Sequence, residues 1–310
     1  MREARERIAD TVLRTPILDN DEINANADAS IYFKCENLQK TGAFKARGAT
    51  NAVLALSGAV ADAGVCTHSS GNHGAALARA ARLRGIPAYI VMPKNSSVIK
   101  QEAVRSFGGH IIWCDSTLAA REKATAAITK ETGATLIHGY DDLQVMAGQG
   151  TVALEFAEDI PGLDVLLCPV GGGGLLSGTA IVSSQLSRTT DVIGVEPSAV
   201  DTAYRSFRSG KRITESKSDT VAEGLRTVLG EKPFRVIQRH VDDIITVSEA
   251  RIFQAMRTLW DRLKLVIEPS GAVGYAAILE YPMRFQGRRI GVILTGGNVD
   301  IDSLQWRSQT

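Results

Sequence analysis

One lysine lies in a short stretch rich in small and apolar residues. Residues 36–49 read ENLQKTGAFKARGA, and Lys45 stands between Phe44 and Ala46. Placing an ammonium group out of reach of water is costly, so the position suits either a lysine that reaches the surface or an amine that takes part in chemistry. In the second case the amine can attack a carbonyl group and form a Schiff base.

Four consecutive glycines form a second candidate site. The segment CPVGGGGLLSG (residues 168–178) reads as a strand, a glycine turn and a helix. An anion at the helix start could be bound by the backbone N–H groups of Gly171, Gly172, Gly173 and Gly174. A tight turn without a ligand would explain the glycines when they are taken alone, but the strand-to-helix context favours a phosphate.

The same glycines resemble two other phosphate-binding patterns. A Walker loop would need a lysine where this sequence has Thr179. A dinucleotide fingerprint is nearly present, since Gly172 and Gly174 are followed by Ser177 in place of the third glycine, and Glu196 ends the next expected strand. A nicotinamide-dependent (NAD) oxidoreductase is therefore an alternative, although it leaves Lys45 unexplained.

Two polar clusters follow expected strands. The segment THSSGNHGAA (residues 67–76) carries four polar side chains, those of Ser69, Ser70, Asn72 and His73. At a helix start they suit a carboxylate or phenolate oxygen, whereas capping needs only one of them. The segment ILTGGNVD (residues 293–300) ends a buried strand on Thr295. With the lysine and the glycine turn, these clusters describe a site for pyridoxal 5′-phosphate (PLP), whose pyridine nitrogen would meet the threonine hydroxyl.

Short apolar runs alternate with helical patterns from about residue 64 onward. The expected strands cover residues 64–68, 86–93, 110–115, 134–139, 163–170 and 191–197, and the expected helices between them cover 72–85, 97–109, 116–133, 148–159 and 175–186. This order predicts parallel sheets with helices on both faces. Ligands bind such sheets at the carboxyl ends of the strands, where the polar clusters lie.

The composition excludes several classes of function. The 310 residues are 44% hydrophobic and 22% charged, with a net charge of +1, so neither nucleic acid nor a membrane is an expected partner. No apolar run reaches the length of a membrane span, and the charged N-terminus lacks a signal-peptide core. Four cysteines without a C-x-x-C pair predict buried free thiols and a cytoplasmic protein.

The motifs occur in an order that is typical of one enzyme family. KCENLQKTGAFKARGA, THSSGNHG, AGQGTVALE, PVGGGGLLSG, VDDI, IEPSGAVG and LTGGNVD resemble the fold type II PLP enzymes over nearly the whole chain, and serine racemase and the serine, threonine and 3-hydroxyaspartate dehydratases in particular. The resemblance implies an α/β fold of the tryptophan synthase β-like kind, with the cofactor between two doubly wound parallel-sheet domains. It also implies a small domain at 64–141, a large PLP-binding domain formed by 1–63 and 142–310, and a homodimer.

The resemblance also assigns roles to residues of the site. It implies that Lys45 carries the cofactor, that Asn72 bonds its 3′-oxygen and that Thr295 meets its ring nitrogen N1. The phosphate would bind at Gly171, Gly172, Gly173 and Gly174. The substrate carboxylate would lie near Ser69, Gly71, Asn72 and His73.

The reaction implied is an elimination. Lys45, released from the cofactor, would take the Cα proton of a β-hydroxy amino acid, which then loses water and ammonia. Ser70 matches the serine that serves the opposite face of Cα in serine racemase, and hydroxyaspartate dehydratases carry it as well. The expected activity is therefore a 3-hydroxyaspartate dehydratase that forms oxaloacetate and ammonia, with L-serine and L-threonine as other substrates and a serine or aspartate racemase as the alternative.

Two further features bear on the ligands. Arg121 aligns with an arginine that contacts a distal carboxylate in serine racemase, and Thr227 stands where the racemase has serine. A guanidinium at that place would favour a dicarboxylate substrate. The family often binds Mg²⁺ or another divalent cation, for which Glu196 and the carbonyl of Val200 match two ligands, but Thr202 replaces the expected aspartate.

Overall fold

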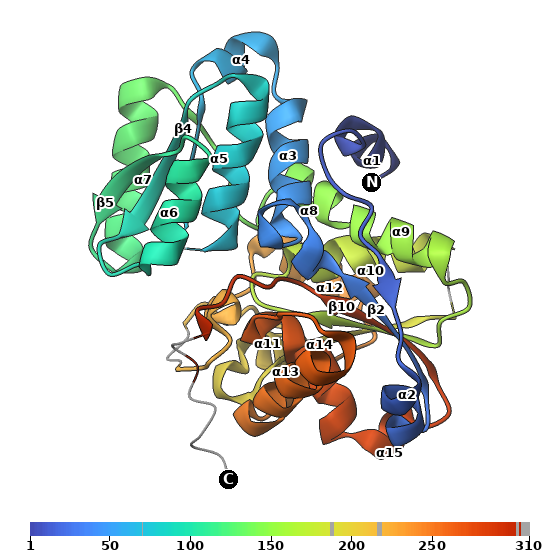
Figure 1. Cartoon of the computed structure of the whole chain (residues 1–310). Coiled ribbons are helices and arrows are strands. Elements are labelled where there is room, and N and C mark those ends of the chain that lie inside the picture. Colours follow the sequence, from blue (N-terminus) through green and yellow to red (C-terminus); the bar gives the residue numbers. More distant parts are fainter. Residues whose placement is uncertain (70, 187–188, 216–218, 302–303, 305–310) are drawn as a thin grey trace.

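The computed structural model describes residues 1–69, 71–186, 189–215, 219–301 and 304, which form two β-sheets with helices on both faces (Figure 1). The larger sheet has the strand order β1-β2-β10-β7-β8-β9. Its strands are β1 (Ile17–Leu18), β2 (Ser30–Cys35), β7 (Val165–Pro169), β8 (Asp191–Pro197), β9 (Asp243–Val247) and β10 (Arg289–Leu294). All neighbours pair in parallel except β1, which joins β2 antiparallel at the edge. The predicted doubly wound α/β fold is confirmed.

The smaller sheet has the order β5-β4-β3-β6 and is entirely parallel. Its strands are β3 (Val65–His68), β4 (Ala88–Pro93), β5 (His110–Cys114) and β6 (Thr135–Leu136). The sequence predicts a strand over 134–139, but only two residues pair. Ile137 still donates a bond of 2.9 Å to the carbonyl of Cys66, and the chain then turns at His138, whose imidazole accepts a hydrogen bond from the N–H of Asp141 (3.0 Å).

The helices follow the predicted alternation. They are α1 (Arg2–Ile8), α2 (Asp21–Ala27), α3 (Lys45–Ala55), α4 (Gly58–Asp62), α5 (Asn72–Arg84), α6 (Val98–Ser106), α7 (Leu118–Thr132), α8 (Leu143–Gln149), α9 (Thr151–Asp159), α10 (Gly174–Leu186), α11 (Thr202–Ser209), α12 (Glu231–His240), α13 (Glu249–Leu263), α14 (Pro269–Glu280) and α15 (Pro282–Phe285), with short 3₁₀ turns at η1 (Glu36–Leu38), η2 (Lys40–Gly42), η3 (Ser198–Val200) and η4 (Glu223–Leu225). The helix predicted over 148–159 is divided at Gly150 into α8 and α9.

Three hydrophobic cores hold these layers together. One lies between the larger sheet and helices α13 and α14, and the second lies on the opposite face of that sheet under α9, α10 and α12. The third lies beneath the smaller sheet and α5, and it includes Ala49 and Val53 of α3 and Val145 of α8. The domain limits of 64–141 stay a prediction, and α3 and α8 pack into the smaller core although they lie outside those limits.

The small residues around Lys45 allow helices to approach one another. Helix α3 packs between α5 and α8 (Figure 1). A methyl group on Gly48 would lie 2.7 Å from the carbonyl oxygen of Val145, and one on Gly148 would lie 2.6 Å from the Cα of Gly48. Close helix packing therefore explains the small side chains that follow the lysine.

A buried charge network anchors the first turn of α3. The guanidinium of Arg47 binds both carboxylate oxygens of Glu36 (2.8 Å each) and both of Glu155 (2.6 and 2.8 Å). The amine of Lys34 adds a bond of 2.7 Å to Glu155. Since all four residues are at most 5% exposed, the network ties α3 to the end of β2 and to α9 away from water.

Two other expectations concern the chain as a whole. Cys35, Cys66, Cys114 and Cys168 are free and buried, as predicted. Within the described ranges, no helix has both the length and the apolar character needed to cross a membrane. The homodimer and the cytoplasmic location stay predictions.

Candidate functional site

Lys45 is the first residue of α3 and is partly buried. Its Nζ donates a hydrogen bond of 2.7 Å to the carbonyl oxygen of Gly139, in the segment that follows β6. Burial lowers the pKa of the Lys45 amine to about 8, although the nearby carboxyl group of Glu268 acts in the opposite direction. A substantial fraction of the amine is therefore neutral, and able to act as nucleophile or base, slightly above neutral pH.

Two uncharged imidazoles lie close to this amine. His73 is buried, and its Nε2 lies 3.1 Å from the carbonyl oxygen of Ile137. Burial, assisted by the charge of Lys45, lowers the pKa of His73 to about 3, and burial lowers that of His138 to about 4. Both rings are neutral at physiological pH, so neither adds a positive charge that would repel the ammonium form of the lysine.

The glycine turn leaves a row of backbone donors unused. Among the residues that the structure describes, none accepts a hydrogen bond from the N–H groups of Gly171 to Gly174, and three of these glycines are buried. Helix α10 begins at Gly174, and Gly173 has a φ of 89°, which favours glycine. Buried donors without acceptors at a helix start match the oxygens of a phosphate.

Tyr140 connects the glycine turn with the lysine. It follows Gly139, the residue that accepts the bond from Lys45, and its hydroxyl lies 2.9 Å from the hydroxyl of Thr227. A methyl group added to Gly172 would lie 2.2 Å from the Tyr140 ring. Close packing against this ring therefore requires a glycine at position 172. The lysine motif and the glycine turn, which are far apart in the sequence, meet at Tyr140.

Asn72, the first residue of α5, is held by two side chains. Its Nδ2 donates to both carboxylate oxygens of Glu268 (2.9 and 3.2 Å), and its Oδ1 accepts a bond of 2.9 Å from Asn298. Glu268 was not among the residues predicted for the site. The signal in the sequence was a charged residue directly before the proline that starts an apolar helix, in the segment IEPSGAVG.

Thr295 directly follows β10 and lies beside the start of α3, the helix that begins with Lys45. Its carbonyl oxygen accepts a bond of 3.0 Å from the N–H of Phe44, and Ala43 pairs with Gly296 in an isolated bridge. Thr295 is 4% exposed. The predicted residues Lys45, Asn72 and Thr295 therefore converge with the glycine turn, whereas the role of the threonine hydroxyl toward N1 stays a prediction.

The residues predicted to contact substrate border the same region. The hydroxyl of Ser69 accepts a bond of 3.2 Å from the N–H of Gly71, which directly precedes α5. Ser70 lies outside the described residues. Arg121 of α7 donates 3.0 Å to the carbonyl of Ser116, and its Nε is buried without a hydrogen-bond partner in the described part of the chain. Burial lowers the pKa of His68, at the end of β3, and the charge of Arg121 lowers it further.

Arg226, the residue directly before Thr227, makes contacts within its own segment. Its Nε donates 2.9 Å to the carbonyl of Thr220, and its Nη2 lies 3.3 Å from a carboxylate oxygen of Asp219. These contacts fit a structural ion pair, and the role of Arg121 toward a second carboxylate stays a prediction.

The predicted cation site has one carboxylate, which is already in use. Glu196 accepts hydrogen bonds from the N–H groups of Ala203 (3.2 Å) and Tyr204 at the start of α11, and burial raises its pKa to about 8. Asp201 pairs with Arg205, and no group of three His, Cys, Asp or Glu residues suited to a metal occurs in the described ranges. The residues present fit a divalent cation poorly, and the cation site at Glu196 and Val200 stays a prediction. The same contacts occupy the acid that a dinucleotide ribose would need.

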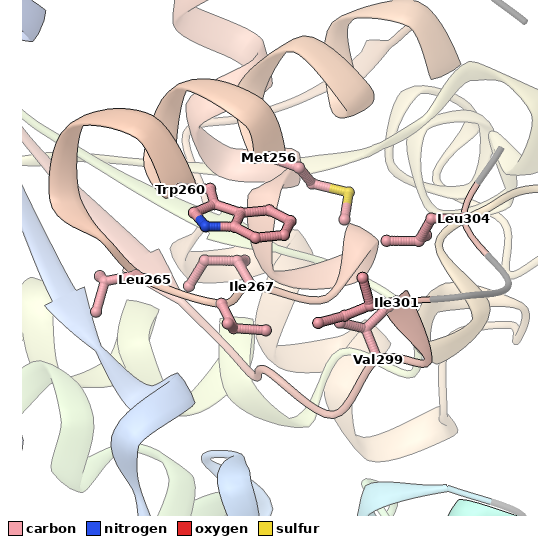
Figure 2. A pocket seen from close by; sticks show the side chains of 8 residues that line it. Met256, Trp260, Leu265, Ile267, Val299, Ile301 and Leu304 are labelled. Atoms are coloured by element: carbon pink, nitrogen blue, oxygen red, sulfur yellow. The ribbon is translucent and has the colours of Figure 1, made fainter. Parts of the chain in front are cut away.

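Apart from the residues around Lys45, an apolar pocket lies between α13 and the segment after β10. Figure 2 shows Met256 and Trp260 on one side and Val299, Ile301 and Leu304 on the other. None of the described residues that line it has an ionisable side chain.

The chain matches known proteins along almost its full length. The model of the family described as pyridoxal-phosphate dependent enzymes matches residues 8–296. The β-hydroxyaspartate dehydratase of Paracoccus denitrificans is 47% identical over 99% of this chain and 97% of its own length, and the serine racemase of Arabidopsis thaliana is 44% identical over 99% and 94%. The structure of maize serine racemase superimposes with a TM-score of 0.95, at 43% identity, and covers 97% of this chain and 93% of that one. PLP fits the unused donors of the glycine turn and the amine beside them, and the chain belongs to the pyridoxal-phosphate dependent enzymes.

Proposed function

We propose that this enzyme is a dehydratase of 3-hydroxyaspartate, which it converts to oxaloacetate and ammonia. The observation that carries the proposal is the position of the Lys45 amine. It is held on Gly139 (2.7 Å), and the next residue, Tyr140, packs against Gly172 of the glycine turn. The similarity to the β-hydroxyaspartate dehydratase of Paracoccus denitrificans supports the choice of substrate.

Bound PLP would make the Cα proton of the substrate acidic by withdrawing electrons from that carbon. The residues of this chain would then supply binding and proton transfer. The N–H groups of the glycine turn would hold the phosphate, and the amide of Asn72 would donate to the 3′-oxygen. Lys45, whose pKa is lowered to about 8, would take the Cα proton at its neutral Nζ. Loss of the β-hydroxyl as water, followed by hydrolysis, releases the oxo acid and ammonia.

The substrate class rests on Arg121. Its buried Nε has no hydrogen-bond partner among the described residues, and an unpaired buried guanidinium nitrogen is costly unless an anion binds it. A second carboxylate on the substrate is such an anion. 3-Hydroxyaspartate has one, whereas serine and threonine do not.

A substrate panel tests the proposed activity. The purified enzyme, supplied with PLP, is incubated with the threo and erythro isomers of 3-hydroxyaspartate, L-serine and L-threonine, and the oxo acid and ammonia are measured. We expect kcat/KM to be highest for a 3-hydroxyaspartate isomer, with equal amounts of oxaloacetate and ammonia. If no member of the panel yields an oxo acid, the proposed dehydratase activity is refuted.

Replacing Arg121 by alanine should change the order of substrates. We expect kcat/KM for 3-hydroxyaspartate to fall by about 10- to 100-fold, the loss expected for one charge-assisted bidentate contact, and kcat/KM for L-serine to change by less than about threefold. Lys123→Ala, an exposed residue on the same helix, serves as the control. An unchanged ratio of the two substrates would contradict the preference for a dicarboxylate.

Serine racemisation is the second candidate activity. The serine racemases of Arabidopsis thaliana and maize are 44% and 43% identical to this chain, and Ser70 matches the residue expected to serve the far face of Cα. Ser70→Ala should abolish racemisation, at least 100-fold below wild type, and leave elimination from the L-isomer within about threefold, because Lys45 serves the other face. Chiral chromatography of the remaining amino acid measures both. Equal loss of the two activities would rule out a role on one face.

A further inference from the structure

Two residues to which the catalytic proposal gives no function meet near the start of the lysine helix. They are the glutamate of IEPSGAVG, Glu268, and the asparagine of LTGGNVD, Asn298. Both bind the side chain of Asn72 directly. We propose that Glu268 and Asn298 are positioning residues, which fix the amide of Asn72 toward the 3′-oxygen of the cofactor and, through the carboxylate of Glu268, control the proton on Lys45.

The orientation of the Asn72 amide is determined by its neighbours. The Nδ2 of Asn298 donates to the carbonyl oxygen of Thr41 (2.7 Å) as well as to the Oδ1 of Asn72 (2.9 Å). Since a backbone carbonyl can only accept, Asn298 must present its NH₂ group there, and Asn72 must therefore present its oxygen to Asn298. The NH₂ group of Asn72 then faces Glu268, whose two carboxylate oxygens (2.9 and 3.2 Å) can share one of its N–H groups, so that the other is available to a phenolate oxygen.

The backbone around this network is shaped to contain it. A methyl group on Gly296 would lie 2.4 Å from Oε1 of Glu268, and one on Gly42 would lie 2.3 Å from Oδ1 of Asn298. The N–H of Glu268 bonds the carbonyl of Gly296 (3.0 Å), and the N–H of Gly297 bonds that of Gly42 (2.9 Å). Two glycines in separate segments therefore provide the room for the two side chains, which indicates a built arrangement rather than a chance contact.

Glu268 lies close to the start of the lysine helix, because Gly296, whose carbonyl accepts a bond of 3.0 Å from the N–H of Glu268, pairs with Ala43, two residues before Lys45. Burial raises the pKa of Glu268 to about 7, while its carboxylate opposes the fall in the pKa of Lys45. The two groups thus change protonation in neighbouring pH ranges. The other charged groups that act on Glu268 are Lys100 of α6 and Glu223 of η4, which pair with each other and have opposite effects.

Two substitutions separate the two roles. Glu268→Gln removes the charge but keeps an acceptor for Asn72, whereas Asn298→Ala removes the second anchor of Asn72 without a change in charge. Glu231→Gln, an exposed carboxylate of α12, is the control. The full chain is freed of PLP, and the pH dependence of Lys45 acetylation, read by mass spectrometry with exposed Lys40 as the internal reference, gives the pKa of the amine. Titration with PLP then gives the affinity.

We expect Glu268→Gln to lower the pKa of Lys45 by about one pH unit, at the smaller end of the effect of a nearby opposite charge, and to change PLP affinity by less than about threefold. Asn298→Ala should leave that pKa unchanged and weaken PLP binding by about 10-fold, as expected when one hydrogen bond is misaligned. The control should change neither. If Glu268→Gln does not fold, Glu268→Asp should keep the pKa and weaken PLP binding, because the shorter side chain keeps the charge and loses Asn72.

An unchanged Lys45 pKa in Glu268→Gln, or an unchanged PLP affinity in Asn298→Ala, would overturn the proposal. A purely structural role for these residues would lower the melting temperature without separating the two readouts. The inference rests on the proposed cofactor chemistry of the site, but both readouts are free of substrate. It can therefore fail while 3-hydroxyaspartate is still the substrate, and hold if another amino acid is.

Discussion

Lys45→Ala is expected to abolish turnover, with kcat at least 10³-fold below wild type on every substrate of the panel. Two effects are lost together, since the amine is both the attachment point of the cofactor and the base at Cα, and general base catalysis alone contributes about 10²- to 10⁴-fold. The fold should persist. Among the described residues, the Nζ makes one hydrogen bond, to Gly139, and the burial of the amine is itself unfavourable, as its lowered pKa of about 8 indicates.

The glycine turn should keep its own function in this variant. Because the donors of Gly171 to Gly174 do not depend on the lysine, Lys45→Ala should still bind PLP, in a form that dialysis removes. Lys40→Ala, an exposed lysine five positions earlier, provides the control and should retain wild-type kcat. Residual turnover above about one-tenth of wild type in Lys45→Ala would contradict the role of this amine.

Arg47→Ala is expected to cause the largest loss of stability. It would leave the carboxylates of Glu36 and Glu155 buried and without their main partner, in a network whose members are at most 5% exposed. Breaking a buried ion pair by removing one partner costs about 3 to 5 kcal/mol in the free energy of unfolding. That loss is a large share of the total stability of a typical domain, so we expect poor yield of folded protein and a much lower urea midpoint.

A surface arginine provides the comparison. Arg14 pairs with Glu158 (3.1 Å) and Asp159, but its side chain is 49% exposed. Arg14→Ala should therefore cost about 1 kcal/mol or less. Urea denaturation followed by circular dichroism measures both variants, and a similar urea midpoint for the two would show that the buried network contributes no more than a surface pair.

The parts of the site that could be predicted are those that are local in sequence. The glycine turn between β7 and α10, the donors at the start of α5 and the strand end at Thr295 each carry their signal within about ten residues, because turns and helix starts restrict residue type directly. The alternation of strands and helices after residue 64 was readable for the same reason. Before that point, short elements such as β1 and α4 have no such periodicity, and the two-residue β1 pairs with its neighbour antiparallel.

The remaining features depend on contacts between distant segments. Arg47 and Glu155 are 108 positions apart, and Asn72 and Glu268 are 196 positions apart. Neither pairing changes the local residue pattern, so sequence periodicity contains no sign of it. The smaller sheet gives a similar example: the apolar run 134–139 satisfies strand propensity, but the contacts of His138 and Gly139 with the site direct the chain away from the sheet after β6.

Reduction of the purified enzyme with sodium borohydride tests the central claim most directly. Borohydride converts a lysine-bound PLP to a stable secondary amine, which peptide mapping by mass spectrometry locates. The account predicts that the visible absorbance of the cofactor disappears and that a single pyridoxyl group is found on the peptide containing Lys45. A modified group on another lysine, or an unmodified Lys45 in protein saturated with PLP, would contradict it.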